Sequence, residues 1–390
     1  MSKNGKIIII GGGASGLAAG VSLARAGWRT AILEAQPRVG RKLISTGNGR
    51  CNFTNINASA KDYFGDAALA APALAAFPPP KVLEFFSSLG IPARVDAEGR
   101  AYPASNMAAS VLDALRLSFA EAGGEEVTGF RVRSLSRELV ATAEDGRTAA
   151  GRCALLATGG LAAPSLGAAD APFVKALGHR FTRRFPALSP LETEPVPALK
   201  GLRAQCVLTM EGRRERGEIL FTEYGVSGIA AMQLSRFARP GALLEVDFLC
   251  GERPALAERA RLLPARRMED FLNGIVPRRV GQVLVKSAGI PLAKMAAELT
   301  EAEIQALETA LTAWTLPVRG ARDLKQAQVT AGGLEGRDFD PQTLESRRVP
   351  GLYAAGEILD VDGPCGGYNL QWAWASALLA AQAMNERLKA

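Results

Sequence analysis

Four consecutive isoleucines, Ile7–Ile10, form an apolar run near the start of the chain with no polar residue between them. A run of this kind beside a turn is typical of a parallel strand that is buried on both faces. The small-residue segment from about Ser15 to Ala26 predicts a helix that Gly27 ends, and Thr30–Leu33 predicts a second strand. The pattern therefore predicts a β–α–β unit at the start of the chain.

The apolar pattern returns later in the chain. Residues 153–160 and 351–357 each predict a short buried strand that ends in small residues, and an alanine-rich helix follows from Trp372 to about Leu388. Alternating segments with several prolines lie over 186–252, and helical spacing lies over 253–320. We therefore expect an α/β fold interrupted by an inserted domain that is β-rich over 186–252 and helical over 253–320, after which the chain returns to α/β character.

Two of the helices expected inside these domains have clear signals. The segment 105–122 carries apolar residues at helical spacing, which predict a stripe in the core: Met107, Val111, Leu115 and Phe119. In the inserted domain, Thr300 and Glu303 form a capping-box pattern that predicts the start of another helix.

The turn after the first strand carries a glycine fingerprint. Gly11, Gly13 and Gly16 fit G-x-G-x-x-G, and Glu34 follows 23 positions after Gly11, where an acid that accepts from a ribose hydroxyl is expected. The helix that begins there presents free N–H groups to a pyrophosphate. The fingerprint indicates a dinucleotide and leaves FAD and NAD open, while the carboxylate disfavours NADP. A glycine-rich turn of another α/β fold is the alternative.

The loop over residues 37–55 is polar, rich in glycine and long for a compact domain, which is typical of functional loops. Arg41, Lys42 and Arg50 can meet phosphate charge, Gly47 can let the backbone pass close to a flat ring, and Cys51 can lie near a redox centre. A surface loop with solvated charges is the alternative.

Small residues also follow the later strands. Ala157-Thr158-Gly159-Gly160 lets the backbone approach a cofactor, or else forms a plain strand-to-loop turn. After Glu357, a glycine-rich turn precedes the last helix. The N-terminus of that helix is expected to face the partly negative pyrimidine end of a flavin, although a second phosphate site is another interpretation.

Composition narrows the classes of protein further. The chain has 390 residues, 48% apolar residues, a net charge of +7 and a pI of about 9.3. The five cysteines form no CxxC pair, and the single histidine excludes any site that needs two imidazoles, so we expect no metal. With no signal segment and no long apolar run, we expect a cytoplasmic protein that does not span a membrane. The arginines over 253–279 favour solvated helix faces over a nucleic-acid patch, because no aromatic residues lie among them.

The motifs together resemble those of a known family. Gly11–Gly16 with Glu34, Ala157–Gly159 and Leu352–Glu357 look like the three FAD-contacting segments of two-dinucleotide-fold flavoproteins. The loop Arg41–Asn55, Thr330-Ala-Gly-Gly-Leu334 and the segment from Gly363 to Ala373 resemble one bacterial family, the BaiN-like NAD(P)/FAD-dependent oxidoreductases, also called aminoacetone oxidase family FAD-binding enzymes. The match covers nearly the whole chain, and Thr46 stands where the family pattern usually has serine.

The resemblance implies a Rossmann-like FAD-binding domain built from both chain ends (1–185 and 325–390), with the inserted domain over 186–324 between them. It also implies non-covalent FAD and a set of contacts. It places the pyrophosphate on Gly11–Gly16, especially Ala14 and Ser15, and the adenosine ribose on Glu34. Arg41, Lys42 and Gly47 flank the middle of the cofactor, and the backbone near Val127 meets the adenine. The remaining contacts come from segments later in the chain: Thr158, Gly159, Gly356, Glu357, Asp360, Asn369, Leu370 and Gln371. Of these, Glu357 and Asp360 are expected near the ribityl and pyrophosphate groups, and the last three at the flavin ring.

We therefore expect an FAD-dependent oxidoreductase that transfers a hydride between the bound flavin and a small-molecule substrate, which binds over the flavin ring between the two domains. No second dinucleotide fingerprint is present, so we expect no dedicated nicotinamide domain, but NAD(P)H can still bind transiently at the flavin as a co-substrate. An oxidase that passes electrons to oxygen and a reductase that takes them from NAD(P)H both stay open. An RNA-associated flavoprotein and a flavin-bound interaction protein without turnover are the alternatives. No catalytic residue can be assigned, and His179, Cys51, Tyr368 and Glu223 are candidates by chemistry alone.

Overall fold

The computed structural model describes residues 3–167 and 170–390 and separates the chain into two compact units. The first unit runs to Phe185 and resumes at Gln328, and the second spans Pro186–Ala327. The second unit therefore ends three residues after the position expected from sequence.

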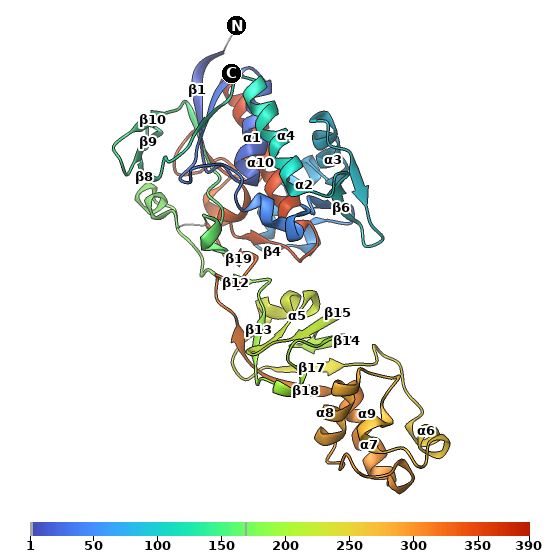
Figure 1. The fold of residues 1–390 in the computed structure, drawn as a ribbon. Helices are drawn as coiled ribbons and strands as arrows, with labels where there is room; N and C mark the ends of the chain where they lie inside the picture. The colour runs from blue at the N-terminus through green and yellow to red at the C-terminus, as the bar shows by residue number, and fades with distance from the viewer. Residues whose placement is uncertain (1–2, 168–169) are drawn as a thin grey trace. The chain divides into compact units, whose positions relative to one another are not determined.

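The first unit is built on a five-stranded parallel sheet, ordered β20-β11-β1-β2-β7 (Figure 1). Its central strand is β1 (Lys3–Ile10), in which Ile7, Ile8 and Ile9 are fully buried. Ile8 pairs with Ala154 on one side and Ala31 on the other. The other strands are β2 (Trp28–Leu33), β7 (Glu125–Val127), β11 (Cys153–Leu156) and β20 (Leu352–Ala354). The predicted Rossmann-like α/β fold is confirmed.

Helices from both chain ends pack in this unit. α1 (Ala14–Arg25) packs against α10 (Tyr368–Lys389), which is red in Figure 1. The others are α2 (Ala67–Ala76), α3 (Pro79–Ser88) and α4 (Ala108–Glu121). The predicted stripe of α4 is buried at Val111, Leu115 and Phe119, but the placement of Met107 was wrong. Met107 is the N-cap, where the backbone is extended and the side chain leaves the helix face, and it is 56% exposed.

Smaller sheets complete the first unit. One is β10-β9-β8, and a second is β3-β6-β5. A third pairs β21 with β4. Their bounds are β3 (Thr54–Asn55), β4 (Phe64–Gly65), β5 (Ala93–Val95), β6 (Arg100–Pro103), β8 (Val132–Leu135), β9 (Val140–Ala143), β10 (Thr148–Ala150) and β21 (Val361–Asp362). The strands at the two connections between units are β12 (Phe185–Ala187) and β19 (Val329–Ala331).

The second unit is a closed antiparallel barrel with strand order β13-β16-β15-β14-β17-β18. The strands are β13 (Leu191–Thr193), β14 (Arg203–Met210), β15 (Arg213–Phe221), β16 (Gly225–Ser227), β17 (Leu243–Asp247) and β18 (Trp314–Ala321). α5 (Ile229–Leu234) lies against β15. Closure leaves this sheet without a free edge and gives the unit a core of its own.

Four further helices lie between β17 and β18. They are α6 (Leu256–Leu262), α7 (Met268–Phe271), α8 (Arg278–Ser287) and α9 (Glu301–Thr312). Thr300 caps α9 in the predicted capping box. The expectation of helix as far as residue 320 was wrong, because Leu316 and Val318 alternate with exposed neighbours as β18 and fill the last place in the barrel.

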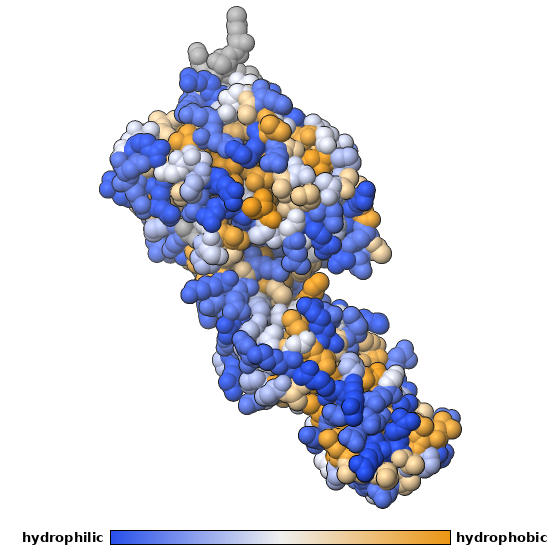
Figure 2. Space-filling view, viewed as in Figure 1, coloured by the Kyte–Doolittle hydropathy of each residue, from blue (hydrophilic) through white to orange (hydrophobic). Residues whose placement is uncertain are grey.

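Hydrophilic residues dominate the visible surface of each unit, and apolar residues are scattered among them (Figure 2). Among the described residues, no helix has the length and apolar character needed to cross a membrane.

Candidate functional site

The glycines at 11, 13 and 16, in the turn between β1 and α1, are of two kinds. Gly11 has a φ of +109°, and a Cβ there would overlap the Ala157 carbonyl. A Cβ on Gly16 would overlap the carbonyl oxygen of Gly11. A Cβ on Gly13, the N-cap of α1, would meet no atom within 4 Å. The first two glycines are required by the fold, whereas Gly13 faces open space at the start of a helix, where a pyrophosphate would fit.

Glu34 is fixed at the carboxyl end of β2. One carboxylate oxygen, Oε2, accepts from the Gly12 N–H at 2.7 Å, and the other accepts from the Gln36 N–H at 2.8 Å. The Glu34 N–H donates to the Val127 carbonyl at 2.9 Å, so the end of β7 lies beside it. Each oxygen keeps a lone pair, so the side chain can still accept from ribose hydroxyls.

A second polar group joins four segments that are far apart in sequence. Lys42 Nζ donates to Glu357 Oε2 at 2.7 Å, and Glu357 Oε1 accepts from the Thr330 N–H at 2.9 Å. The Thr330 hydroxyl oxygen accepts from the N–H groups of Leu161 and Ala162. Sequence reasoning predicted Lys42 and Glu357 separately but missed this role of Thr330.

The other predicted residues of the early loop lie close by. Arg41 donates to the Gln36 side chain at 2.7 Å and to the Ser165 carbonyl at 3.1 Å. Gly47 adopts a left-handed conformation inside the helical turn η1 (Leu43–Gly49). The Asp360 carbonyl accepts from the Asp66 N–H at 2.6 Å, which ties the start of β21 to the start of α2.

Two buried polar atoms in these loops have no protein partner among the described residues: Thr158 Oγ1 and Asn52 Oδ1. Such orphans are rare in native structures and call for an explanation. Both belong to segments expected to contact FAD, and they accompany the open space at Gly13. The residues present therefore fit a dinucleotide held along the carboxyl edge of the sheet.

The start of α10 differs from the sequence prediction. The helix begins at Tyr368, four residues before the predicted Trp372, because Gly367 takes a left-handed N-cap conformation with a φ of +101°. Asn369 folds back to the loop before it, since its Nδ2 donates to the Gly363 carbonyl at 2.7 Å and its Oδ1 accepts from the Gly363 N–H at 2.9 Å.

Gln371 is fully buried in the first turn of α10. Its Oε1 accepts from the Thr54 hydroxyl at 2.6 Å, and its Nε2 donates to the Phe77 carbonyl at 2.8 Å. The side chains of Asn369 and Gln371 thus hold the loop and the helix in place, and ring contact through them stays an untested prediction. Leu370 is half-buried beside them, and the Gly356 N–H donates to Ser376 of the same helix.

His179 is a buried, hydrogen-bonded residue. Ser346 Oγ accepts from the N–H groups of Arg348 and Val349, so its proton points to His179 Nε2 at 3.0 Å. This arrangement favours the tautomer with the ring proton on Nδ1, which lies 3.4 Å from Asp338 Oδ2 and makes no hydrogen bond to it. Burial lowers the pKa of His179, against the opposing effect of Asp338. This group has the order of a Ser–His–Asp triad, but all three residues are buried, so a structural role fits better.

The other three candidates for acid–base catalysis, Cys51, Tyr368 and Glu223, differ in burial, position and pKa. Burial raises the pKa of the Cys51 thiol to about 12, so it is neutral at physiological pH. Tyr368 is the first residue of α10, and burial raises its pKa above the usual value. Glu223 is exposed on the second unit, where its ion pair with Lys200, at 2.7 Å, lowers its pKa. None of these observations assigns a catalyst.

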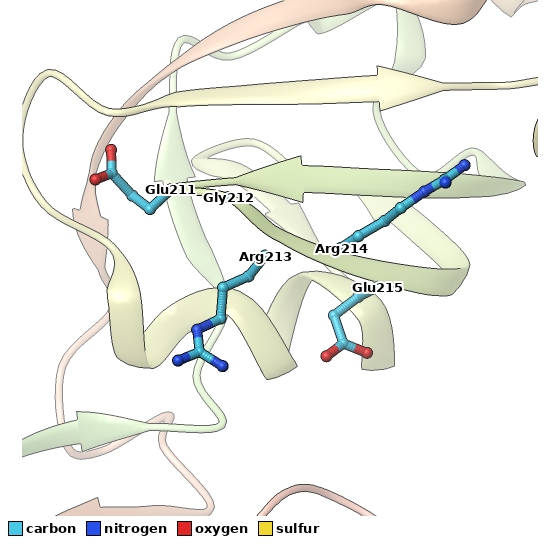
Figure 3. Close-up of a pocket in the computed structure, with 5 residues that line it drawn as sticks. All are labelled: Glu211, Gly212, Arg213, Arg214 and Glu215. Atoms are coloured by element: carbon cyan, nitrogen blue, oxygen red, sulfur yellow. The ribbon is translucent and has the colours of Figure 1, made fainter.

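A hollow on the second unit lies at the hairpin between β14 and β15 (Figure 3). Its lining is polar and open to solvent: Glu211, Gly212, Arg213, Arg214 and Glu215. Glu211 is paired with Arg239, and the Arg213 guanidinium lies 4.3 Å from the Phe237 ring centre. The hollow contains no predicted FAD contact, so its chemistry does not support a cofactor site. Among the described residues no cluster of metal ligands is present.

A family model described as the HI0933-like protein Rossmann domain matches residues 5–383. The chain belongs to this family. It is also 37% identical to the 3-dehydro-bile acid delta(4,6)-reductase of Clostridium scindens, over 98% of this chain and 99% of that protein. It is 32% identical to the ribosomal RNA dihydrouridine synthase of Escherichia coli strain K12, over 96% of each chain.

Among solved structures, the 3-ketosteroid delta1-dehydrogenase of Sterolibacterium denitrificans matches with a TM-score of 0.53 and 12% identity, over 98% of this chain and 99% of that one. At this identity the match supports the fold alone. Membership of the HI0933-like family confirms the predicted resemblance and the predicted class, a flavin-dependent oxidoreductase with a Rossmann-like FAD domain.

Proposed function

We propose that this chain uses non-covalently bound FAD and NAD(P)H to reduce a carbon–carbon double bond conjugated with a carbonyl group in a small-molecule substrate. The observation that carries the proposal is the dinucleotide-binding geometry of the first unit, with Gly13 open and Glu34 fixed. The reaction type comes from the two relatives, whose names describe reduction of a steroid double bond and of the uracil ring. In both substrates the double bond is conjugated with a carbonyl group.

The residues of the first unit have distinct roles in this proposal. The N–H groups around Gly13 and Ser15, at the start of α1, bind the pyrophosphate, and Glu34 accepts from the adenosine ribose. Lys42 and Glu357 fix the loops along the middle of the cofactor. The N-terminus of α10 directs free N–H groups and a positive dipole end toward the flavin pyrimidine.

When bound, FAD supplies the ring that accepts and donates the hydride. Reduction of the substrate adds two electrons and two protons, so the second proton must come from a protein group or from water. We leave that donor unassigned, because His179 and Cys51 are buried, Glu223 lies on the second unit, and no observed contact ties the Tyr368 hydroxyl to a substrate. We also propose that the protein is cytoplasmic, since NAD(P)H is available in the cytoplasm.

An anaerobic experiment tests this function. The FAD-loaded protein is mixed with NADPH or NADH, and the flavin absorption is expected to bleach. A 3-keto-4,6-diene steroid is then added, and the absorption is expected to return with one saturated bond formed per flavin. A flavin that neither nicotinamide bleaches would contradict the reductase proposal and leave an oxidase or an interaction protein.

A second candidate substrate is ribosomal RNA. It is favoured by the Escherichia coli relative, which covers 96% of this chain, and by the net charge of +7. The absence of a nucleic-acid partner therefore stays a prediction. Dihydrouridine in ribosomal RNA incubated with the reduced enzyme, in place of steroid turnover, would favour this candidate.

A further inference from the structure

One face of the sheet β3-β6-β5 carries arginines around a tyrosine. Arg100 and Tyr102 alternate with the buried Ala101 and Pro103 along β6, so both point to the outer face. Arg94 of β5 is the register partner of Tyr102 and therefore shares this face. The Arg50 guanidinium lies 4.8 Å from the centre of the Tyr102 ring. We name Arg50, Arg94 and Tyr102 the basic–aromatic face.

Arg50 and Arg94 supply the net positive charge of the basic–aromatic face, and the neighbouring Arg100 does not add to it. Arg100 is neutralised, because it pairs with Asp96 at 2.7 Å and with Glu98 at 2.6 Å. Within the described parts of the chain, no carboxylate lies at ion-pair distance from Arg50 or Arg94, and both side chains are exposed. Two solvated cations therefore flank one aromatic ring.

The basic–aromatic face lies next to the loop that leads into α10. The Asn55 Nδ2 donates to the Gly366 carbonyl at 3.1 Å, and Asn55 is the register partner of Arg100. A Cβ on Gly366 would lie 3.8 Å from the Arg100 side chain. The face is therefore continuous with the helix N-terminus expected at the flavin ring, on the substrate side of the proposed site.

We infer that the basic–aromatic face binds single-stranded RNA beside the flavin. The inference deepens the RNA candidate and rests on the proposed position of FAD. A guanidinium stacked on an aromatic ring offers a flat cation on which a base can stack, and a neighbouring arginine can meet a phosphate. An uncharged steroid nucleus would instead need an apolar wall, which two exposed arginines do not provide.

Matched variants of the FAD-loaded protein test the inference by binding of a fluorescent single-stranded RNA from ribosomal RNA at several salt concentrations. Arg94→Ala is expected to weaken binding and to reduce the slope of log affinity against log salt by about 0.7. Tyr102→Leu is expected to weaken binding about tenfold, and Tyr102→Phe to stay within about twofold of wild type.

Arg133→Ala is the control. It removes an equal charge from β8, in another sheet of the same unit (Figure 1), and is expected to leave the slope unchanged. FAD content is measured for every variant to show that the cofactor site is intact. An equal effect of Arg94→Ala and Arg133→Ala, or no RNA binding by wild type at low salt, would overturn the inference.

NADPH affinity and anaerobic bleaching are measured on the same variants. If Arg94→Ala weakens NADPH and leaves RNA binding unchanged, the face binds the dinucleotide and the inference is overturned. If RNA binding depends on the face but no nicotinamide bleaches the flavin, the proposed reductase function fails and the RNA-binding face stands.

Discussion

At the scale of single residues, the first turn separates groups that the fold needs from groups that a ligand needs. A side chain at Gly11 or Gly16 would overlap backbone atoms of the first unit itself. Gly13 has a φ of −81°, which other residues adopt readily, and open space around it. A pyrophosphate in that space would explain a glycine at this position.

Substitution of two of these glycines should therefore give opposite results. Gly13→Ala should lower the unfolding free energy of the apoprotein by about 1 kcal/mol or less, since alanine is a poorer N-cap than glycine, but should weaken FAD binding tenfold or more, about 1.4 kcal/mol. Gly16→Ala should destabilise the apoprotein itself, because its Cβ overlaps the Gly11 carbonyl. Urea unfolding and quenching of FAD fluorescence measure the two effects. Unchanged FAD affinity in Gly13→Ala would contradict the pyrophosphate assignment.

The half-buried pair of Lys42 and Glu357 should contribute stability through its hydrogen bonds. Glu357→Ala should cost about 1–3 kcal/mol, because it leaves both Lys42 and the Thr330 N–H without a partner. A double-mutant cycle with Lys42→Met should give a coupling energy above about 0.5 kcal/mol. Additive losses would show that the two loops are held together by other contacts.

Sequence could predict those residues whose role depends on their neighbours in the chain. The glycines and Glu34 act through the local strand–turn–helix geometry, so spacing alone located them. Thr330 and the side-chain role of Gln371 depend on contacts with residues 27 and 317 positions away in the chain. Their only signal was their place inside motifs that resemble the family.

At the scale of elements, burial pattern predicted the central strands well and the ends of elements less well. The start of α10 depends on the left-handed conformation of Gly367, which packs against Thr54. β18 forms because it pairs with β13 and β17. The alternation of buried and exposed residues within β18 is short and follows a long helical segment, so it predicts a strand only weakly. Boundaries set by tertiary contacts are the ones that sequence missed.

The loop that contains Ser346 is tied to the rest of the first unit by His179, which gives a prediction for acid stability. Because burial lowers the folded pKa of His179 below its ordinary 6.5, the unfolded chain binds a proton that the folded chain does not. Stability should be complete above about pH 6.5 and fall below it. Urea unfolding from about pH 7.5 to about pH 5.5 measures the slope.

The control for this prediction is His179→Gln, which cannot titrate. Its unfolding free energy should be lower at neutral pH, but its loss between the same pH values should be smaller than that of the wild type. Equal slopes in the two proteins would show that His179 is not held neutral.

At the scale of the whole molecule, the second unit is a self-contained insertion. Its barrel has a separate core, and its first and last strands pair through Leu191 and Ala321, so both ends of the unit meet. The Arg322 N–H also donates to the Pro190 carbonyl at 2.8 Å. This arrangement is typical of a domain inserted at one surface point of another.

Residues 186–327 expressed alone should therefore unfold cooperatively in urea. The first unit, with this segment replaced by a short glycine–serine linker, should still bind FAD, because every predicted contact belongs to it. Circular dichroism and FAD titration test the two pieces. A second unit without a cooperative transition would contradict its independence.

The central claim is that the first unit holds a redox-active FAD. Anaerobic titration of the purified FAD-loaded chain with NADPH, followed by its absorption spectrum, tests it most directly. The account predicts one flavin per chain, bleached by about one equivalent of NADPH or NADH and restored by a conjugated carbonyl substrate. A chain that neither retains nor takes up FAD would contradict it.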